Sequence, residues 1–380
     1  MDFLLDGIRA FTWQQAVMFA VGFTLIWLAI KKQCEPMLLL PMGFGAILVN
    51  IPFSGALNQV LPGVGETQGA IQWLFEVGIE SSEILPLLLF IGIGAMIDFS
   101  PLFQRPIYFV FAAAAHFGIF ATIVLACVLG FDLRDAAAIG IIGAADGPTT
   151  ILVAQVLQSK YMGAIAVTAY SYMALVPIIQ PAVIYLLTSR DERRIRMEPT
   201  KDSDIPRTVR ILFPIAVTIV VGLISPAAVS LIGFLMFGNL IRECGVLESL
   251  SRTAQNELTN LITLLLGIII AFTMKADQFV TRDTIMILGL GLFAFVCDTA
   301  AGLLFAKFLN LFLRKKINPM IGATGISAFP MSARVIHKLA MKEDPGNILI
   351  MQAVSANVAG QIASVAASGL VLSLVLKYLQ

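Results

Sequence analysis

The sequence is poor in charged residues, and this shortage excludes the common classes of soluble protein. Only 13% of its 380 residues are Asp, Glu, Lys or Arg, whereas 58% are hydrophobic. A typical soluble domain carries about 25% charged residues. A chain of this length could not hide so much apolar surface while showing water so few charges. Soluble enzymes, disordered chains and secreted disulfide scaffolds are therefore excluded, and the composition indicates an integral protein of the lipid bilayer.

Several functional signatures are also missing. The 25 basic and 24 acidic residues nearly balance, so no basic surface for nucleic acid is expected. The four cysteines form no CxxC pair, and the two histidines, His116 and His337, lack metal-ligand spacing. The chain has no P-loop, which excludes ATP hydrolysis by the chain itself. No basic segment precedes the first apolar run, so we expect the first helix to be retained.

What the sequence does contain is long apolar runs. About 20 apolar residues span the hydrocarbon of a bilayer as a helix. The runs lack the alternating pattern of a barrel wall. We therefore predict an all-α polytopic membrane protein of about ten or eleven segments. Runs free of charged residues lie at 11–30, 36–65, 107–131, 161–189, 211–241 and 347–376, and shorter or interrupted ones at 84–97, 136–159, 258–274, 284–306 and 317–333.

One Arg-rich polar stretch divides the chain, and we expect it to be a solvated loop on the cytoplasmic side. On each side of it a leucine-rich stretch is followed by a glycine-alanine motif, at 143–148 and at 322–325. Such repeated halves are common in secondary transporters. We therefore predict two pseudo-symmetric halves resembling an inverted repeat. The expected organisation is an N-terminal transmembrane helix (1–35), a first repeat (36–188), the basic loop (189–210) and a second repeat (211–380).

The first repeat is interrupted by a helix-breaking segment that carries an acid. Gly147 and Pro148 cannot continue a regular helix. The freed backbone groups must then face protein or a wet cavity. Asp146 lies at the break, where an unpartnered carboxylate costs several kcal/mol. Thr149 and Thr150 add hydroxyls suited to cation binding or to capping; the alternative is a kinked helix with a capping aspartate.

The second repeat has a matching break over residues 317–334, with two prolines and two glycines. Asn318, Thr324, Ser327 and Ser332 supply neutral oxygens there. Such oxygens together with one carboxylate suit a small hard cation. Arg334 is a natural partner for a carboxylate. The alternative for Arg334 is a residue that extends its charge to the membrane surface.

Further polar residues lie inside apolar runs. Asn357 and Gln361 are four residues apart, hence on one helix face, with Ser364 three residues further on. They either line a site or hydrogen-bond neighbouring helices. Tyr172 is either a proton donor or a packed aromatic. Asp98 reads as a cap before a proline, and Asp298 interrupts a span without a partner that we can assign.

Together these segments resemble the β subunit of the sodium-pumping, biotin-dependent decarboxylases of glutaconyl-CoA, methylmalonyl-CoA or oxaloacetate. The matches keep the family's order, and the compact chain is more similar to the acyl-CoA systems than to the oxaloacetate type. The matching pieces are residues 92–99, 143–149, 238–245, 318–322 continuing through Ser327 to Arg334, 345–348 and 355–360.

The resemblance implies a translocase subunit in a prokaryotic inner membrane. It would decarboxylate carboxybiotin, consume a proton and couple this step to Na+ export. Na+ and carboxybiotin would be its cofactors. Its partners would be a biotin carrier, a carboxyltransferase and a small membrane subunit, and we also expect a homo-oligomer.

The resemblance also assigns roles to individual residues. Asp146, Tyr172 and Arg334 would be catalytic, and Arg334 and Ser327 would contact carboxybiotin. With the hydroxyl of Thr149 included, the predicted Na+ ligands are Asp146, Thr149, Asn318, Gly322, Ser327 and Asn357.

These residues suggest that Asp146 holds Na+ and a proton in turn. Desolvation favours the neutral acid and Na+ favours the carboxylate, so one ion displaces the other. Two other functions stay open on physical grounds. A Na+-coupled secondary carboxylate transporter would use the same broken helices. A cation channel fits a single dehydrated acidic site less well.

Overall fold

The computed structural model describes the chain except for residues 1–4, 34–35, 62, 64, 105, 198–204 and 380. Nearly all regular structure in the described part is helical. Its strands are β1 (Gln59–Leu61) and β2 (Gly65–Thr67), which form an antiparallel hairpin. The predicted all-α class is confirmed.

Seven helices of the described part are long and apolar enough to cross a membrane, and a pair bent by 64° would make an eighth span. The chain is therefore a multi-pass membrane protein. The count is lower than the ten or eleven predicted, because the other apolar runs form short or broken helices. The seven spans are α2 (Trp13–Lys32), α7 (Ile107–Ala115) with α8 (Phe117–Val128), α11 (Met162–Leu187), α13 (Arg207–Ile224), α15 (Glu248–Thr253) with η5 (Ala254–Leu258), α16 (Thr259–Ile270) and η6 (Ala271–Met274), α18 (Arg282–Leu309), and α20 (Ile350–Leu379).

The remaining helices are shorter. The bent pair consists of α4 (Ala70–Phe75) with η2 (Glu76–Glu80), followed by α5 (Ile84–Met96). The others are α1 (Asp6–Arg9), α3 (Pro36–Val49), α6 (Ser100–Gln104), α9 (Leu133–Gly140), η3 (Ile141–Ala144), α10 (Gly147–Val156), α12 (Arg190–Arg193), η4 (Pro226–Ala228), α14 (Val229–Glu243), α17 (Ala276–Phe279), η7 (Pro319–Gly325) and α19 (Met331–Glu343).

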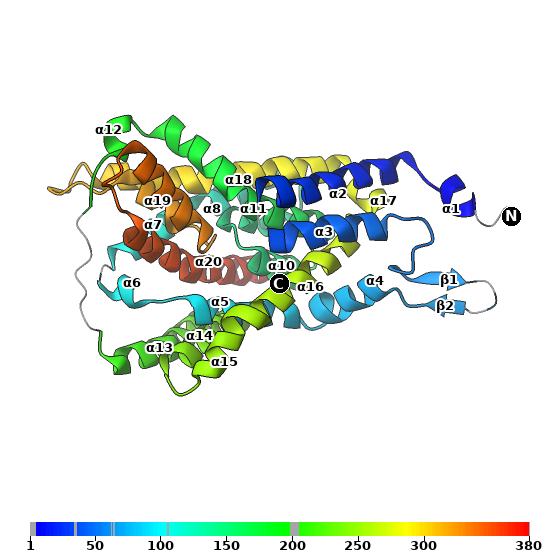
Figure 1. Cartoon of the computed structure of the whole chain (residues 1–380), viewed down its shortest axis with the longest axis horizontal. Helices are drawn as coiled ribbons and strands as arrows, with labels where there is room; N and C mark the ends of the chain where they lie inside the picture. Colours follow the sequence, from blue (N-terminus) through cyan, green and yellow to red (C-terminus); the bar gives the residue numbers. More distant parts are fainter. Residues whose placement is uncertain are drawn as a thin grey trace.

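Most helices run along the long axis of the molecule, with α12 at one end and the β1–β2 hairpin at the other (Figure 1). The two broken segments lie in the core: residues 135–154 and 318–328 are buried throughout. α18 packs against α8, η3 and η7, and α20 packs against η7 and α10. Two long helices therefore hold both breaks in place.

Candidate functional site

Asp146 lies at the break between η3 and α10. Ala145, which precedes it, has a left-handed backbone (φ 55°), and Asp146 itself is extended, so the chain turns sharply before α10 begins. Pro148 lies in the first turn of α10, where its missing N–H costs nothing. Asp146 is the N-cap of α10: its Oδ1 accepts the backbone N–H of Thr149 at 3.3 Å. The predicted break is thus an interrupted helix with an acid at the new N-terminus.

The second broken segment reaches the same carboxyl group. Ser327 follows η7 in extended chain, and its backbone N–H donates to Ala144 O at 2.9 Å. The Ser327 hydroxyl donates to Asp146 Oδ2 at 3.0 Å, and the Ser364 hydroxyl of α20 donates to the same oxygen at 3.1 Å. The two broken segments and α20 therefore meet at one carboxyl group, and Thr149 and Ser327 lie beside Asp146.

Two side chains of α20 hold the extended segment, and in the described part of the chain their amides bond its carbonyls rather than Asp146. The Asn357 amide donates to Ile326 O at 2.7 Å and to Thr324 O at 3.3 Å. The Gln361 amide donates to Ser327 O. These bonds satisfy carbonyls that the break leaves without helical partners. Asn357 therefore positions the segment that presents Ser327.

A cavity of about 280 Å³ opens beside Asp146. It combines apolar walls with amides and hydroxyls, and none of its lining residues is Lys or Arg. Asp146 is only 5% exposed, and the described part of the chain gives it no ion pair. A carboxylate here has oxygen and amide neighbours but no fixed countercharge. Its polar lining comprises Asp146, Tyr170, Gln255, Thr259, Asn260, Thr263, Ser327 and Gln361.

Tyr170, rather than Tyr172, is the tyrosine of this cavity. Tyr170 is buried, and its ring packs against Gly147, where a Cβ atom would come within 2.4 Å of it. The hydroxyl of Tyr172 donates to Leu288 O of α18 at 2.7 Å, and Tyr172 does not line the cavity. The sequence singled out Tyr172, because only packing shows which face of α11 meets Asp146.

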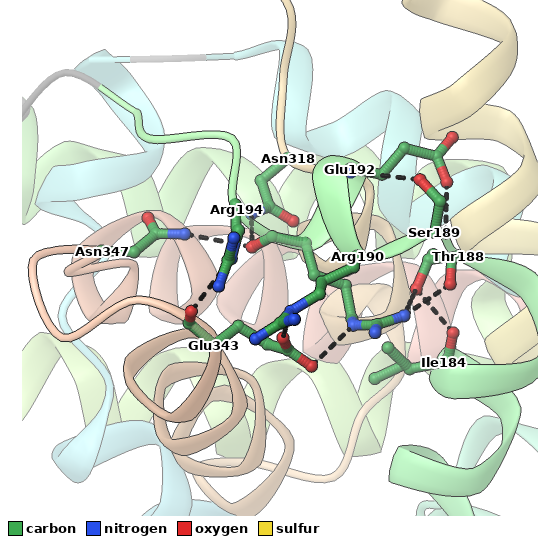
Figure 2. A network of polar contacts seen from close by, with 10 residues as sticks. Ile184, Thr188, Ser189, Arg190, Glu192, Arg194, Asn318, Glu343 and Asn347 are labelled. Carbon is green, nitrogen blue, oxygen red and sulfur yellow. Dashed lines mark hydrogen bonds and ion pairs between the residues drawn. The ribbon is translucent and has the colours of Figure 1, made fainter.

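Asn318 lies at the start of η7, and η7 separates it from Ser327. The seven-residue rise of a 3₁₀ helix is about 14 Å. The Asn318 amide donates at 2.9 Å to the carbonyls of Arg193 and Ile195 in the basic loop. Asn347 donates to the same two carbonyls, and Figure 2 shows both asparagines beside this loop. Asn318 therefore joins η7 to the loop, and the structure does not bring it to Asp146.

Two further predicted residues also lie apart from the carboxyl group. Gly322 is packed on α18: a Cβ atom there would lie 2.0 Å from Gly302 O, so the glycine permits close contact of η7 with α18. Arg334 is exposed on α19 and does not line the cavity. It lies one turn after Met331, which does line it.

Residues 189–197 of the basic loop contact neighbouring elements and are not merely a solvated linker. Arg193 is 9% exposed and binds Glu343 at 3.1 Å and Thr188 O at 2.5 Å. Beyond the spans, a two-bond contact with Arg196 (2.7 and 2.9 Å) lowers the pKa of Asp344 to about 2. These contacts tie the loop to the corner between α19 and α20.

Comparisons with known proteins bear on the whole chain. The family model described as the Na+-transporting oxaloacetate decarboxylase beta subunit matches residues 14–375. Glutaconyl-CoA decarboxylase subunit beta of Acidaminococcus fermentans is 46% identical over 97% of this chain and 96% of its own. Methylmalonyl-CoA decarboxylase subunit beta of Veillonella parvula is 46% identical over 97% and 95%. Oxaloacetate decarboxylase beta chain 2 of Salmonella typhi is 43% identical over 95% of each chain. The chain therefore belongs to the family of Na+-transporting decarboxylase beta subunits.

Proposed function

We propose that this chain, a membrane subunit of a Na+-pumping decarboxylase, removes CO₂ from carboxybiotin in the cavity beside Asp146 and couples this step to Na+ export. Family membership favours this function over a Na+-coupled carboxylate transporter. It also makes the chain one subunit of a multi-subunit complex.

One observation carries the proposal: a buried carboxyl group that neighbours two hydroxyl donors and no basic side chain of the cavity lining. A bare carboxylate at this depth is costly, so the group binds either a proton or a cation. The oxygens of Asp146, Ser327 and Ser364 form a ligand set suited to a small hard cation. Na+ is that cation as transported substrate.

The cavity also has the character of a small-molecule site. Such sites combine mostly apolar walls with a few placed polar groups. Here Met96, Met173 and Phe329 contribute apolar surface, and Asn260 and Thr263 of α16 contribute polar groups to the lining. We assign this space to the ring system of carboxybiotin, whose ureido group would bind the amides and hydroxyls.

The proposed chemistry needs a proton as well as a site. The bond between the ring nitrogen and the carboxyl carbon breaks, CO₂ leaves, and the nitrogen keeps the electron pair and takes up a proton. Asp146 and Tyr170 are the cavity groups able to carry that proton. Na+ binding at Asp146 would displace a proton toward the nitrogen, which links ion movement to decarboxylation.

The complex supplies what this chain does not contain. We propose that a biotin carrier and a carboxyltransferase deliver carboxybiotin, that a small membrane subunit completes the complex, and that the pump lies in a prokaryotic inner membrane. Arg334 is exposed on α19, one turn after the cavity-lining Met331, and we propose that it attracts the anionic group on its way in.

The test is decarboxylation of free carboxybiotin by the purified chain, in Na+ and in K+. Asp146→Asn should abolish Na+-stimulated CO₂ release, because Asn cannot exchange a proton for Na+. The matched control is Asp277→Asn, on an exposed residue of α17, which should keep wild-type rates. Full Na+-stimulated turnover by Asp146→Asn would overturn the proposal.

A further inference from the structure

α19 presents three exposed basic residues on one face. Arg334, Lys338 and Lys342 follow one another at intervals of four residues, so they form a single row along the helix. All three side chains are exposed, and the described part of the chain gives none of them an ion pair. We call these three residues the α19 stripe. The other face of the helix is buried against α20 and α11.

The arginines of the basic loop beside α19 differ from the stripe, because acids of the chain neutralise them. Glu343, the acid of α19, pairs with Arg190 at 3.4 Å and with Arg193 at 3.1 Å (Figure 2). Asp344 pairs with Arg196 at 2.7 Å. Within the described residues, the acids next to α19 are thus occupied by the loop, and the positive charge of the stripe stays uncompensated.

Such a row of like charges has a cost and a restriction. Like charges four residues apart on a helix repel each other and weaken it. Unpaired charges inside the hydrocarbon of a membrane are costlier still, so the stripe faces water. A water-facing row of cations that weakens its own helix calls for an anionic partner from outside the chain.

The position of α19 relates the stripe to the cavity. Met331, the first residue of the helix, lines the cavity beside Asp146. Arg334 lies one turn further on, and Lys342 lies in the last turn, about 17 Å from Met331 along the helix axis. α19 lies at the same end of the molecule as α12 (Figure 1). The stripe therefore leads from the cavity toward the end of the molecule that carries the basic loop.

The length and the start of the stripe favour a protein partner. Arg334 and Lys342 are about 12 Å apart along the helix, farther than a single carboxylate can bridge. An anionic bilayer attracts basic residues at the membrane boundary. The stripe instead begins one turn from the cavity that holds Asp146. An extended acidic surface of a folded domain fits both features.

We propose that the α19 stripe is the docking surface for the soluble domain that carries carboxybiotin, and that this domain meets the stripe with an acidic surface. The inference rests on the proposed function, which places decarboxylation in the cavity beside Asp146. A domain docked here holds its tethered group at the end of α19 where the cavity begins. Complementary charge of this kind speeds encounter and makes it dependent on salt.

The experiment compares carrier-bound with free carboxybiotin. The purified chain receives either the carboxylated biotin-carrier subunit of its complex or free carboxybiotin, and CO₂ release is measured at low and at high salt. The double variant Lys338→Glu/Lys342→Glu should raise KM for the carrier about tenfold or more at low salt, and less at high salt. Its rate on free carboxybiotin should stay within about twofold of the wild-type rate, because free carboxybiotin needs no docking surface.

Matched variants separate the charge of the stripe from its fold. Lys338→Arg/Lys342→Arg keeps both charges and should keep the wild-type KM for the carrier. Lys316→Glu, on an exposed residue between α18 and η7, changes a charge outside the stripe and should also keep it. If the glutamate variant does not fold, Lys338→Gln/Lys342→Gln replaces it, and the same rise in KM, smaller in size, is required.

The outcomes separate this inference from the proposed function. No CO₂ release from free carboxybiotin by the wild type contradicts the proposed function itself. Release from free carboxybiotin together with an unchanged KM for the carrier in the double variant overturns the docking surface. Equal losses on both substrates also overturn it, because the stripe would then attract the small anion. So does an effect that is seen only in vesicles containing phosphatidylglycerol and not in phosphatidylcholine vesicles, which would identify a lipid contact.

Discussion

Asp146 is surrounded by groups that change roles easily. A serine hydroxyl donates a hydrogen bond to a carboxylate and, after rotation, offers its lone pairs to a cation. An arginine or lysine would occupy the carboxylate permanently. Ser327 and Ser364 on one oxygen, with the Thr149 amide on the other, therefore suit a site whose occupant alternates.

Ser364→Ala tests this arrangement, because α20 supplies that hydroxyl from outside both breaks. Removing one ligand should weaken Na+ binding about tenfold, or about 1.4 kcal/mol. The measurement is the Na+ concentration for half-maximal CO₂ release. Ser355→Ala is the control, since that hydroxyl bonds Met351 O of its own helix. An unchanged Na+ dependence in Ser364→Ala would argue against hydroxyl ligation.

The two tyrosines of α11 give a second comparison. If the cavity tyrosine transfers a proton, Tyr170→Phe should lower kcat by about 10²–10⁴. Tyr172→Phe should stay within about threefold, since it loses only a bond to Leu288 O. Single-turnover decay of carboxybiotin measures both. The reverse ranking would restore the role that the family resemblance assigned to Tyr172.

The basic loop links the elements that carry these residues. Asn318 lies at the start of η7 and Asn347 lies before α20. Both side-chain amides donate hydrogen bonds to the same two loop carbonyls, those of Arg193 and Ile195. η7 leads to Ser327, and α20 carries Ser364. The loop thus fixes the start of η7 relative to the start of α20.

Asn318→Ala separates a structural role from ligation. Loss of three side-chain hydrogen bonds should lower stability by about 1–3 kcal/mol, seen as a lower Tm. Na+ affinity should stay within about twofold, as in the control Asn347→Ala, which loses bonds to the same carbonyls. A large loss of Na+ affinity at constant Tm would instead identify Asn318 as a ligand.

The corner between α19 and α20 has a defined pH response. The Arg196 contact lowers the pKa of Asp344 from 3.8 to about 2. A depressed folded-state pKa stabilises the corner above pH 3.8, and that contribution disappears as the pH falls through about 2. The wild-type chain should therefore still resist pepsin below pH 3.8. Arg196→Ala should lose this resistance at a higher pH than the wild type does. Identical pH profiles would contradict the ion pair.

Across the full chain, the parts governed by local chemistry were predictable. Long uncharged runs gave the spans, such as α2 within residues 11–30. Gly147 and Pro148 located the break before α10, because their backbone limits act without help from other elements. That Ser327 shares a site with Asp146 was implied by the family resemblance, and in the structure the Ser327 hydroxyl donates to Asp146 Oδ2 at 3.0 Å.

The rest depends on which helix faces meet, and this is decided by packing. Asn318 and Ser327 belong to one broken segment, yet Asn318 precedes η7 and Ser327 follows it, so they lie beyond opposite ends of that helix. Nothing in a sequence read alone states that Gly118 and Gly143 enclose Asp298, or that Tyr170 rather than Tyr172 lines the cavity. The division into two pseudo-symmetric halves stays a prediction.

The central claim is that Asp146 couples Na+ movement to CO₂ release. The most direct measurement is uptake of radioactive Na+ into vesicles that hold the complete complex, with CO₂ release recorded on the same sample. The account predicts that Asp146→Asn stops both together while the complex still assembles. Na+ uptake that continues in this variant, driven by ongoing decarboxylation, would contradict it.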